Sequence, residues 1–245
     1  MPGSDRELYD RGVATLLASW EEYARGSLGA ALVQLDGATA AVFTEQPERA
    51  VYNNALVDRG LHSSACATAV NGIEAAYAAA GISEFAVWVH ESDNRASHEL
   101  SARGYRVSET TRAMGMDLAG APRSAPEVPI LHADWSEYLR ILGVPPGFLS
   151  GADPNAFHVL VAQLGEDNVA TAMAFDHEGD CGVFNVTTLE TARRRGLGTA
   201  LTSRHVQEAV ARGCTTASLQ STPMAERVYA AVGFRDLGKI LEFTR

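Results

Sequence analysis

Arg193-Arg194-Arg195-Gly196-Leu197-Gly198-Thr199 is a basic, glycine-containing segment between a strand-like run and an amphipathic helical stretch. A glycine turn that enters a helix exposes several backbone N–H groups together with the positive end of the helix dipole. The glycines let the backbone approach a ligand closely because no Cβ intervenes, and the arginines add positive charge. The segment therefore predicts a phosphate-binding turn, with a solvated basic turn at a helix start as the alternative.

Two other phosphate-binding loops do not fit this segment. A Walker loop ends in Gly-Lys-Ser/Thr, and a dinucleotide fingerprint has a third glycine at a set spacing. Neither pattern is present at residues 193–199.

Composition limits the class of protein. The chain has 245 residues, 46% hydrophobic and 20% charged, which suits one large globular domain or two of about 120 residues. No apolar run approaches the roughly 18 residues of a membrane helix, and no secretory signal begins the sequence. A net charge of -10 argues against nucleic acid as the main partner, because phosphate binding needs clustered positive charge. We expect a cytoplasmic protein without a membrane partner.

The potential metal ligands show no metal-binding pattern. Cys66, Cys181 and Cys214 are odd in number, far apart and without CxxC spacing, which predicts reduced packing residues. The 7 histidines show no spacing such as HExxH. We predict no metal.

The first half of the sequence predicts an ordered series of helices and strands. Helical apolar spacing indicates helices, short apolar runs between turn residues indicate strands, and Asp36-Gly37 indicates a hairpin. The predicted elements are a helix at residues 5–25, strands at 30–35, 38–43 and 51–57, a helix at 64–80, a strand at 84–90, a helix at 92–102, and strand-like stretches at 105–107 and 112–118.

The same order recurs after residues 119–126, whose small residues and prolines are typical of a linker. Asp134 is predicted to cap the first helix of this half, which ends at Gly143 and Pro145-Pro146. The predicted elements are a helix at 135–142, strands at 156–164, 168–175 and 181–188, a helix at 198–212, a strand at 216–220, a helix at 224–232, and strands near 234 and at 239–244.

A direct comparison of the halves supports a repeat. Residues 87–106 lie over residues 216–235 at one constant offset, and the match rests mainly on element order. The identical pairs are Ser92/Ser221, Ala96/Ala225, Gly104/Gly233 and Arg106/Arg235.

The quoted segment resembles the Arg/Gln-x-x-Gly-x-Gly/Ala pyrophosphate loop of the GNAT superfamily of acyl-CoA-dependent N-acyltransferases. A second motif of that family, similar to Leu-Tyr-x-x-x-Gly-Phe, follows in the right order as Val228-Tyr229-Ala230-Ala231-Val232-Gly233-Phe234. The resemblance covers residues 130–245 well and extends to the first half through element order and Gly104-Tyr105.

This resemblance implies an α+β (α/β mixed sheet) fold with two tandem GNAT-like domains. Each domain would be a twisted, mostly antiparallel sheet flanked by helices. The implied bounds are a degenerate N-terminal domain at 1–119, a linker at 120–129 and an acetyl-CoA-binding domain at 130–245.

The resemblance also implies how acetyl-CoA, as co-substrate, is held. The strand ending in Val186, Thr187 and Thr188 would pair through its main chain with the pantetheine arm, where that strand splays from its neighbour. Arg193 stands at the first motif position. The pyrophosphate would be bound by the backbone amides of Arg194, Arg195, Gly196, Leu197, Gly198 and Thr199.

Tyr229 matches the family tyrosine that hydrogen-bonds the CoA sulfur and can protonate the leaving thiolate. The alternative is a buried helix tyrosine whose hydroxyl is bound to the backbone. Thr222 stands where the family often has asparagine, and we predict Thr222 as N-cap and Pro223 as the first helical residue.

The first half departs from the family motifs. Leu100 stands at the tyrosine position, and residues 61–67, where the phosphate loop is expected, have neither closely spaced glycines nor arginines. We interpret this half as a degenerate copy kept as scaffold or substrate wall.

The general base is open. Family members often place a glutamate on the strand before the loop, but residues 181–188 contain no carboxylate. The candidates are His158, His177, Glu178, Asp180 and Asn185, each with a surface turn or a satisfied core polar group as the alternative.

We therefore predict an acetyl-CoA-dependent N-acetyltransferase in which an amine attacks directly. The alternative is a non-catalytic acyl-CoA-binding or regulatory protein, favoured by the degenerate half and the missing strand carboxylate. The acceptor is a small-molecule amine or a peptide, including a protein terminus. The sequence predicts no oligomeric state.

Overall fold

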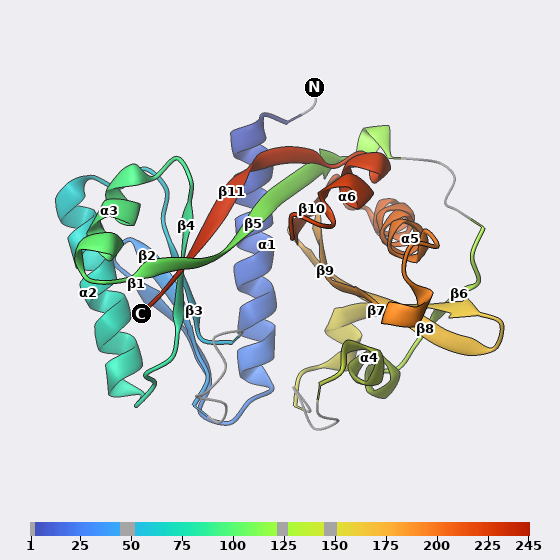
Figure 1. Cartoon of the computed structure of the whole chain (residues 1–245), viewed down its shortest axis with the longest axis horizontal. Coiled ribbons are helices and arrows are strands. Elements are labelled where there is room, and N and C mark those ends of the chain that lie inside the picture. Colours follow the sequence, from blue (N-terminus) through green and yellow to red (C-terminus); the bar gives the residue numbers. More distant parts are fainter. Residues whose placement is uncertain (1–2, 45–51, 122–126, 145–150) are drawn as a thin grey trace. The chain divides into compact units, whose positions relative to one another are not determined.

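A computed structural model describes residues 3–44, 52–121, 127–144 and 151–245 (Figure 1). Contacts divide the chain into two units that are not consecutive in sequence. We call Met1–Ser19 with Ala113–Leu237 the C-terminal unit, and Trp20–Arg112 with Gly238–Arg245 the N-terminal unit. Three elements, α1 (Asp5–Arg25), β5 (Arg106–Asp117) and β11 (Arg235–Thr244), contribute residues to both units.

The N-terminal unit has a mixed sheet. β1 pairs antiparallel with β2, β2 antiparallel with β3, β3 parallel with β4, and β4 antiparallel with Ile240–Phe243 of β11. The last residues of the chain therefore complete this sheet. Its own elements are β1 (Ala31–Leu35), β2 (Ala38–Val42), β3 (Asn54–Val57), α2 (Ser63–Ala79), β4 (Ala86–His90) and α3 (Asn94–Ala102).

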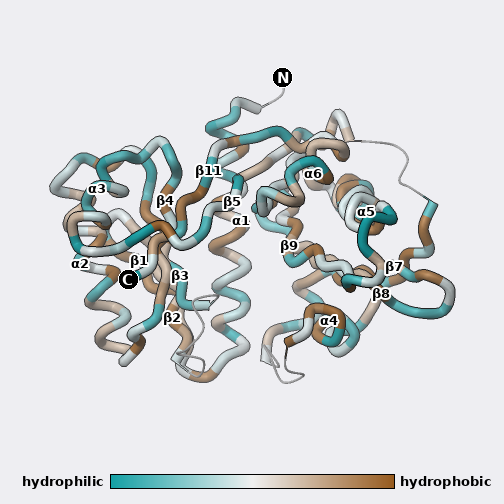
Figure 2. Tube along the Cα trace, viewed as in Figure 1, coloured by the Kyte–Doolittle hydropathy of each residue, from teal (hydrophilic) through white to brown (hydrophobic). Residues whose placement is uncertain are grey.

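Helix α2 shows why this sheet holds together. Val70, Ile73 and Tyr77 recur at helical spacing and are fully buried against the strands. The Tyr77 hydroxyl donates a hydrogen bond to the carbonyl of Ala41 (2.9 Å), so the buried polar group is satisfied. Figure 2 shows brown, apolar stretches along β2 in this unit and along β9 and α4 in the other.

The C-terminal unit repeats the pairing order. β7 pairs antiparallel with β8, β8 antiparallel with β9, and β9 parallel with β10, as β1 to β4 do. β6 adds an antiparallel edge to β7. The elements are β6 (Ile130–His132), α4 (Trp135–Leu142), β7 (Phe157–Leu164), β8 (Asp167–His177), β9 (Asp180–Thr188), α5 (Leu197–Arg212), β10 (Thr216–Ser221) and α6 (Glu226–Val232).

The paired glycines of the repeat have the same structural role. Gly104 (φ 90°) follows α3 and Gly233 (φ 117°) follows α6, and both have a left-handed backbone that favours glycine. Two residues later Arg106 begins β5 and Arg235 begins β11. The predicted mixed α/β fold with a twofold repeat is therefore confirmed.

Several element predictions need correction. β5 is one strand that runs through residues 108–111 between the two predicted stretches, and β11 is likewise one strand. β6 was not predicted. α6 begins at Glu226, because Thr222 accepts from the amide of Ala225 (3.0 Å) in a turn and does not cap the helix.

Some predictions lie outside the described residues. These are the start of the strand predicted at 51–57, the prolines after α4 and residues 122–126 of the linker, so the domain bounds stay a prediction. Asp134 does cap α4, accepting from the amide of Glu137 (2.9 Å). Within the described ranges, none of the helices combines the length and hydropathy needed to cross a bilayer.

Candidate functional site

Strand β9 is irregular near its end. Thr171 of β8 faces Thr187 and Met173 faces Phe184, so β9 has one extra residue and forms a β-bulge. Asn185 lies in the bulge with φ 53°, a conformation in which asparagine is enriched among non-glycine residues. The bulge also changes which side chains face α5. Val183 before it and Val186 after it both pack in the cluster beneath α5 and α6.

Strands β9 and β10 separate at the same place. Their parallel pairing runs from Asp180 and Thr216 to Val183 and Leu219. β9 continues to Thr188 without β10 as a partner. Residues 184–188 therefore have one main-chain edge that β10 does not use.

The turn after β9 leads into an open helix N-terminus. Gly196 (φ 76°) precedes α5, and no side chain caps the helix. The first helical hydrogen bond runs from the amide of Ala200 to the carbonyl of Gly196 (2.9 Å). The amides of residues 197–199 therefore have no acceptor among the described residues. Such amides, with the helix dipole, attract anions.

The three arginines before this helix strengthen that attraction. Arg193, Arg194 and Arg195 are exposed, and none forms an ion pair with a described residue. The Arg193 side chain donates one long hydrogen bond, from Nε to the carbonyl of Thr188 (3.4 Å). Arg194 has φ 61°, so the turn contains a second left-handed residue beside Gly196.

Helix α6 lies beside the start of α5. A Cβ on Gly198 would meet Val186 of β9 at 3.7 Å and Val228 of α6 at 3.8 Å. Tyr229, the next residue of α6, is 6% exposed and packs with the same cluster. The structure thus brings together the end of β9, the glycine turn and Tyr229.

The Tyr229 hydroxyl is available for a ligand. It has no hydrogen-bond partner among the described residues, in contrast to the alternative of a hydroxyl bound to the backbone. The hydroxyl oxygen does not belong to the fully buried polar atoms that lack a partner in the described chain, so part of its surface is accessible. Burial raises the pKa of Tyr229 to about 12, so the phenol stays protonated at neutral pH.

Three of the base candidates lie around the turn from β8 to β9, away from the bulge. His177, Glu178 and Asp180 line a cavity of about 550 Å³ together with charged residues from the first turns of α1. The buried Asp180 carboxylate accepts hydrogen bonds from three hydroxyl groups, one on α1 and two on β10. The donors are Thr15 (2.8 Å), Thr216 (2.6 Å) and Ser218 (2.6 Å).

The other two candidates, His158 and Asn185, lie in different places. His158 of β7 lies 3.6 Å from the Asp176 carboxylate, which also accepts two hydrogen bonds from Arg212. Only Asn185 lies at the bulge, where its side-chain amide donates to the hydroxyl of Tyr138 (2.7 Å). An amide is not a proton acceptor at neutral pH, so no base stands out from this set.

The corresponding place in the N-terminal unit is different. His62 caps α2, and its Nδ1 accepts from the amide of Ala65 (3.2 Å). A cavity of about 300 Å³ lies where β3 leads into α2 and β4 into α3. Its charged lining residues are Asp58, Asp93 and Arg95, and burial together with Asp36 raises the pKa of Asp58.

The cysteines are buried and free. Over the described residues, no group of three potential ligands could hold a metal ion.

Comparison with known proteins agrees with this geometry. The family model for the acetyltransferase (GNAT) domain matches residues 155–236, which include β7 to α6. The chain contains a GNAT domain. Among curated proteins, none matches the chain.

Solved structures resemble nearly the whole chain around this GNAT domain. A GCN5-related N-acetyltransferase from Kribbella flavida has TM-score 0.72 and 18% identity, covering 97% of this chain and 95% of its own. One from Sphaerobacter thermophilus has TM-score 0.61 and 19% identity, with 85% and 76% covered. A tandem GNAT protein from the clavulanic acid biosynthesis pathway has TM-score 0.61 and 13% identity, with 100% and 97% covered. These likenesses show the fold.

The sequence did not reveal two features of the GNAT domain. The β9 bulge depends on the register with β8, which no local pattern in residues 181–188 announces. The contact between Tyr138 and Asn185 joins residues far apart in sequence. The only local signal was the asparagine itself, a residue type that tolerates the left-handed conformation.

Proposed function

We propose that the C-terminal unit binds acetyl-CoA and transfers the acetyl group to the amine of an acceptor. The observation that carries this proposal is the open N-terminus of α5. Its first amides lack acceptors in the described chain, and three unpaired arginines precede it. A pyrophosphate would satisfy both kinds of group at once.

The pantetheine arm would extend from that turn along β9. Val186, Thr187 and Thr188 lie beyond the last residue paired with β10, so their free edge can bond the two amides of the arm as a further strand would. Gly198 lets the chain of the cofactor approach between Val186 and Val228.

In the proposed reaction the amine nitrogen attacks the acyl carbonyl carbon. A C–N bond forms, the C–S bond breaks, and CoA leaves as a thiolate. Positioning of the two substrates and stabilisation of developing charge would supply most of the rate. Because Asn185 is the only base candidate at the bulge, the proton of the attacking amine would leave to water.

Tyr229 would stabilise the leaving sulfur. A thiol has a pKa of about 8.5 by analogy with cysteine, whereas that of Tyr229 is raised to about 12. Complete proton transfer from the phenol to the thiolate is therefore uphill. A hydrogen bond from the hydroxyl to the developing thiolate is the role that the raised pKa favours.

One acetyl-CoA would bind per chain. Helix α2 begins with a filled cap and a cavity carrying two carboxylates, both unfavourable for pyrophosphate. The N-terminal unit would serve as scaffold or substrate wall.

A second candidate function is a non-catalytic acyl-CoA sensor. It is favoured by the lack of a carboxylate at 181–188 and by the position of Asp180 at the other end of β9. In that case acetyl-CoA would bind and no acceptor would release CoA.

The test measures release of free CoA thiol from acetyl-CoA against a panel of primary amines and of peptides with free N-termini. Calorimetry with acetyl-CoA runs on the same preparation. Acceptor-dependent release with one bound cofactor supports the transferase, and the peptide arm decides the acceptor class. Binding without release supports the sensor. Absence of binding would overturn both.

A further inference from the structure

Asn185 has an unusual environment for an exposed strand residue. It adopts φ 53°, which costs a non-glycine residue about 1 kcal/mol or more relative to the extended form. Its side chain is exposed at the bulge, yet its Nδ2 group bonds the hydroxyl of Tyr138 at 2.7 Å. Tyr138 is only 2% exposed, so the hydrogen bond holds the exposed Asn185 side chain against a buried residue, which we call the anchor.

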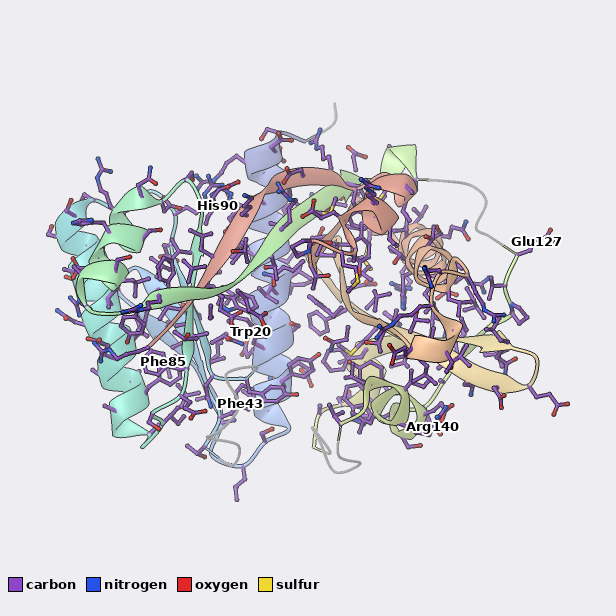
Figure 3. All side chains as sticks on the ribbon, viewed as in Figure 1. Trp20, Phe43, Phe85, His90, Glu127 and Arg140 are labelled. Atoms are coloured by element: carbon purple, nitrogen blue, oxygen red, sulfur yellow. The ribbon has the colours of Figure 1, made fainter. Side chains whose placement is uncertain are left out.

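The anchor is itself fixed. Tyr138 lies on α4, whose cap Asp134 accepts from the amide of Glu137 (2.9 Å). Glu137 accepts from Asn168 of β8 (2.7 Å) and from Arg140. Arg140, labelled in Figure 3, also donates to the carbonyl of Asn168 (3.1 Å). Helix α4 is therefore fastened to the strand that pairs with the bulge.

The bulge lies where the proposed thioester would react. It begins after Phe184, one residue beyond the last residue paired with β10, and Val186 packs in the same cluster as Tyr229. The extra residue of a bulge leaves the hydrogen-bond ladder. An amide of this kind, held in place before reaction, can polarise an acyl carbonyl and stabilise the oxyanion that forms on attack.

We propose that Tyr138 is a positioning residue. Its hydroxyl fixes Asn185 and thereby the β9 bulge, whose amides receive the developing negative charge of the acyl oxygen. The inference rests on the proposed acetyl transfer. Helix α4 would thereby position the acyl group, whereas the glycine turn and Tyr229 act on the pyrophosphate and the sulfur.

Two variants remove the contact from opposite sides. Tyr138→Phe deletes only the hydroxyl, and Asn185→Gly keeps the left-handed backbone without strain while deleting the side chain. Each should lower kcat about five- to tenfold and leave the dissociation constant of acetyl-CoA unchanged, because the glycine turn is untouched. The double variant should be no slower than the slower single variant.

Asn185→Asp supplies a conservative rescue. Its carboxylate accepts a hydrogen bond from the Tyr138 hydroxyl with donor and acceptor reversed, so hydrogen exchange at residues 184–187 should stay within about threefold of the wild type. Tyr77→Phe is the matched control, since it loses one buried tyrosine hydrogen bond in the N-terminal unit. It should lower stability and leave kcat unchanged.

Hydrogen exchange gives a readout that is independent of turnover. Both contact-breaking variants should speed exchange at the amides of residues 184–187 by about tenfold while α4 keeps its protection. Unchanged exchange and unchanged kcat would overturn the positioning role even if the wild type transfers acetyl groups. A wild type that releases no CoA would overturn the proposed function instead, and the exchange data would still decide whether Tyr138 holds the bulge.

Discussion

Helices α5 and α2 follow equivalent strands in the two units, but their N-termini differ in what they leave open. α5 begins at Gly196 without a side-chain cap and beside three arginines. α2 is capped by His62, whose ring nitrogen accepts a hydrogen bond from a helix amide, beside a cavity lined by two carboxylates and one arginine. The same fold therefore leaves the N-terminus of α5 open to an anion and blocks the N-terminus of α2. Fold repetition alone does not carry binding function, which depends on the residues at the site.

The tyrosine of α6 provides the largest expected effect. Leu100 of α3 stands at the equivalent position, so Tyr229 distinguishes the halves chemically. Tyr229→Phe keeps the ring but removes the hydrogen bond to the leaving sulfur, and should lower kcat about a hundredfold to a thousandfold with a near-constant KM for acetyl-CoA. Steady-state kinetics and a melting curve on one preparation test this. Full activity with a lowered melting temperature would mark Tyr229 as a packing residue.

The glycine turn should control cofactor affinity. Gly196→Glu combined with Gly198→Glu adds negative charge and side chains at the open helix end, and should weaken acetyl-CoA binding by about a hundredfold or more in calorimetry. Ser63→Glu combined with Ser64→Glu places the same charge in the first turn of α2 and should leave the affinity unchanged. If both changes weakened binding equally, the two helix ends would be equivalent after all.

Acid should destabilise α5 in the C-terminal unit more than α2 in the N-terminal unit. His205 of α5 is fully buried, and desolvation lowers its pKa from 6.5 to about 4, whereas the buried face of α2 is formed by Val70, Ile73 and Tyr77. Below pH 6.5 His205 binds a proton in the unfolded chain but stays neutral in the folded chain. The free energy of unfolding therefore falls as the pH falls.

The expected loss is about 2 kcal/mol between about pH 7.5 and about pH 5. Hydrogen exchange should rise in α5 more than in α2, and His205→Leu should remove this difference. Equal acid sensitivity of the two helices, or a His205→Leu protein that still shows the difference, would refute the role of His205.

Removing the side-chain cap of α2 should have the smallest effect. His62→Ala removes the α2 cap and should cost about 1 kcal/mol of stability, seen as a lower melting temperature. Calorimetry should still report one acetyl-CoA per chain, because Asp58 and Asp93 remain. A second binding event in this variant would show that the cap alone closes the N-terminal unit.

Much of the fold follows from local pattern. Helix α1 has the predicted bounds, and the glycine turn lies at the start of α5, because amphipathic spacing and helix-terminating glycines are local signals. The repeat likewise followed mainly from element order, and its paired Gly104 and Gly233 both have a left-handed backbone.

The division of the chain did not follow from local pattern. Gly238–Arg245 belongs to the N-terminal unit and Met1–Ser19 to the C-terminal unit. The first assignment depends on pairing between β11 and β4, and the second on the bond from Thr15 to Asp180 (2.8 Å). Contacts of such long sequence separation have no periodicity in the sequence.

The sequence by itself determined most of the elements, the twofold repeat and the residues of the glycine turn, because each depends on side-chain spacing over a few turns of chain. Only the tertiary structure decided which helix end is open, where β9 bulges, and that Tyr138 holds Asn185. These features depend on strand register and on which groups find partners across the fold. Hydrogen-bond partners are chosen by proximity in space, which the linear order of residues does not encode locally.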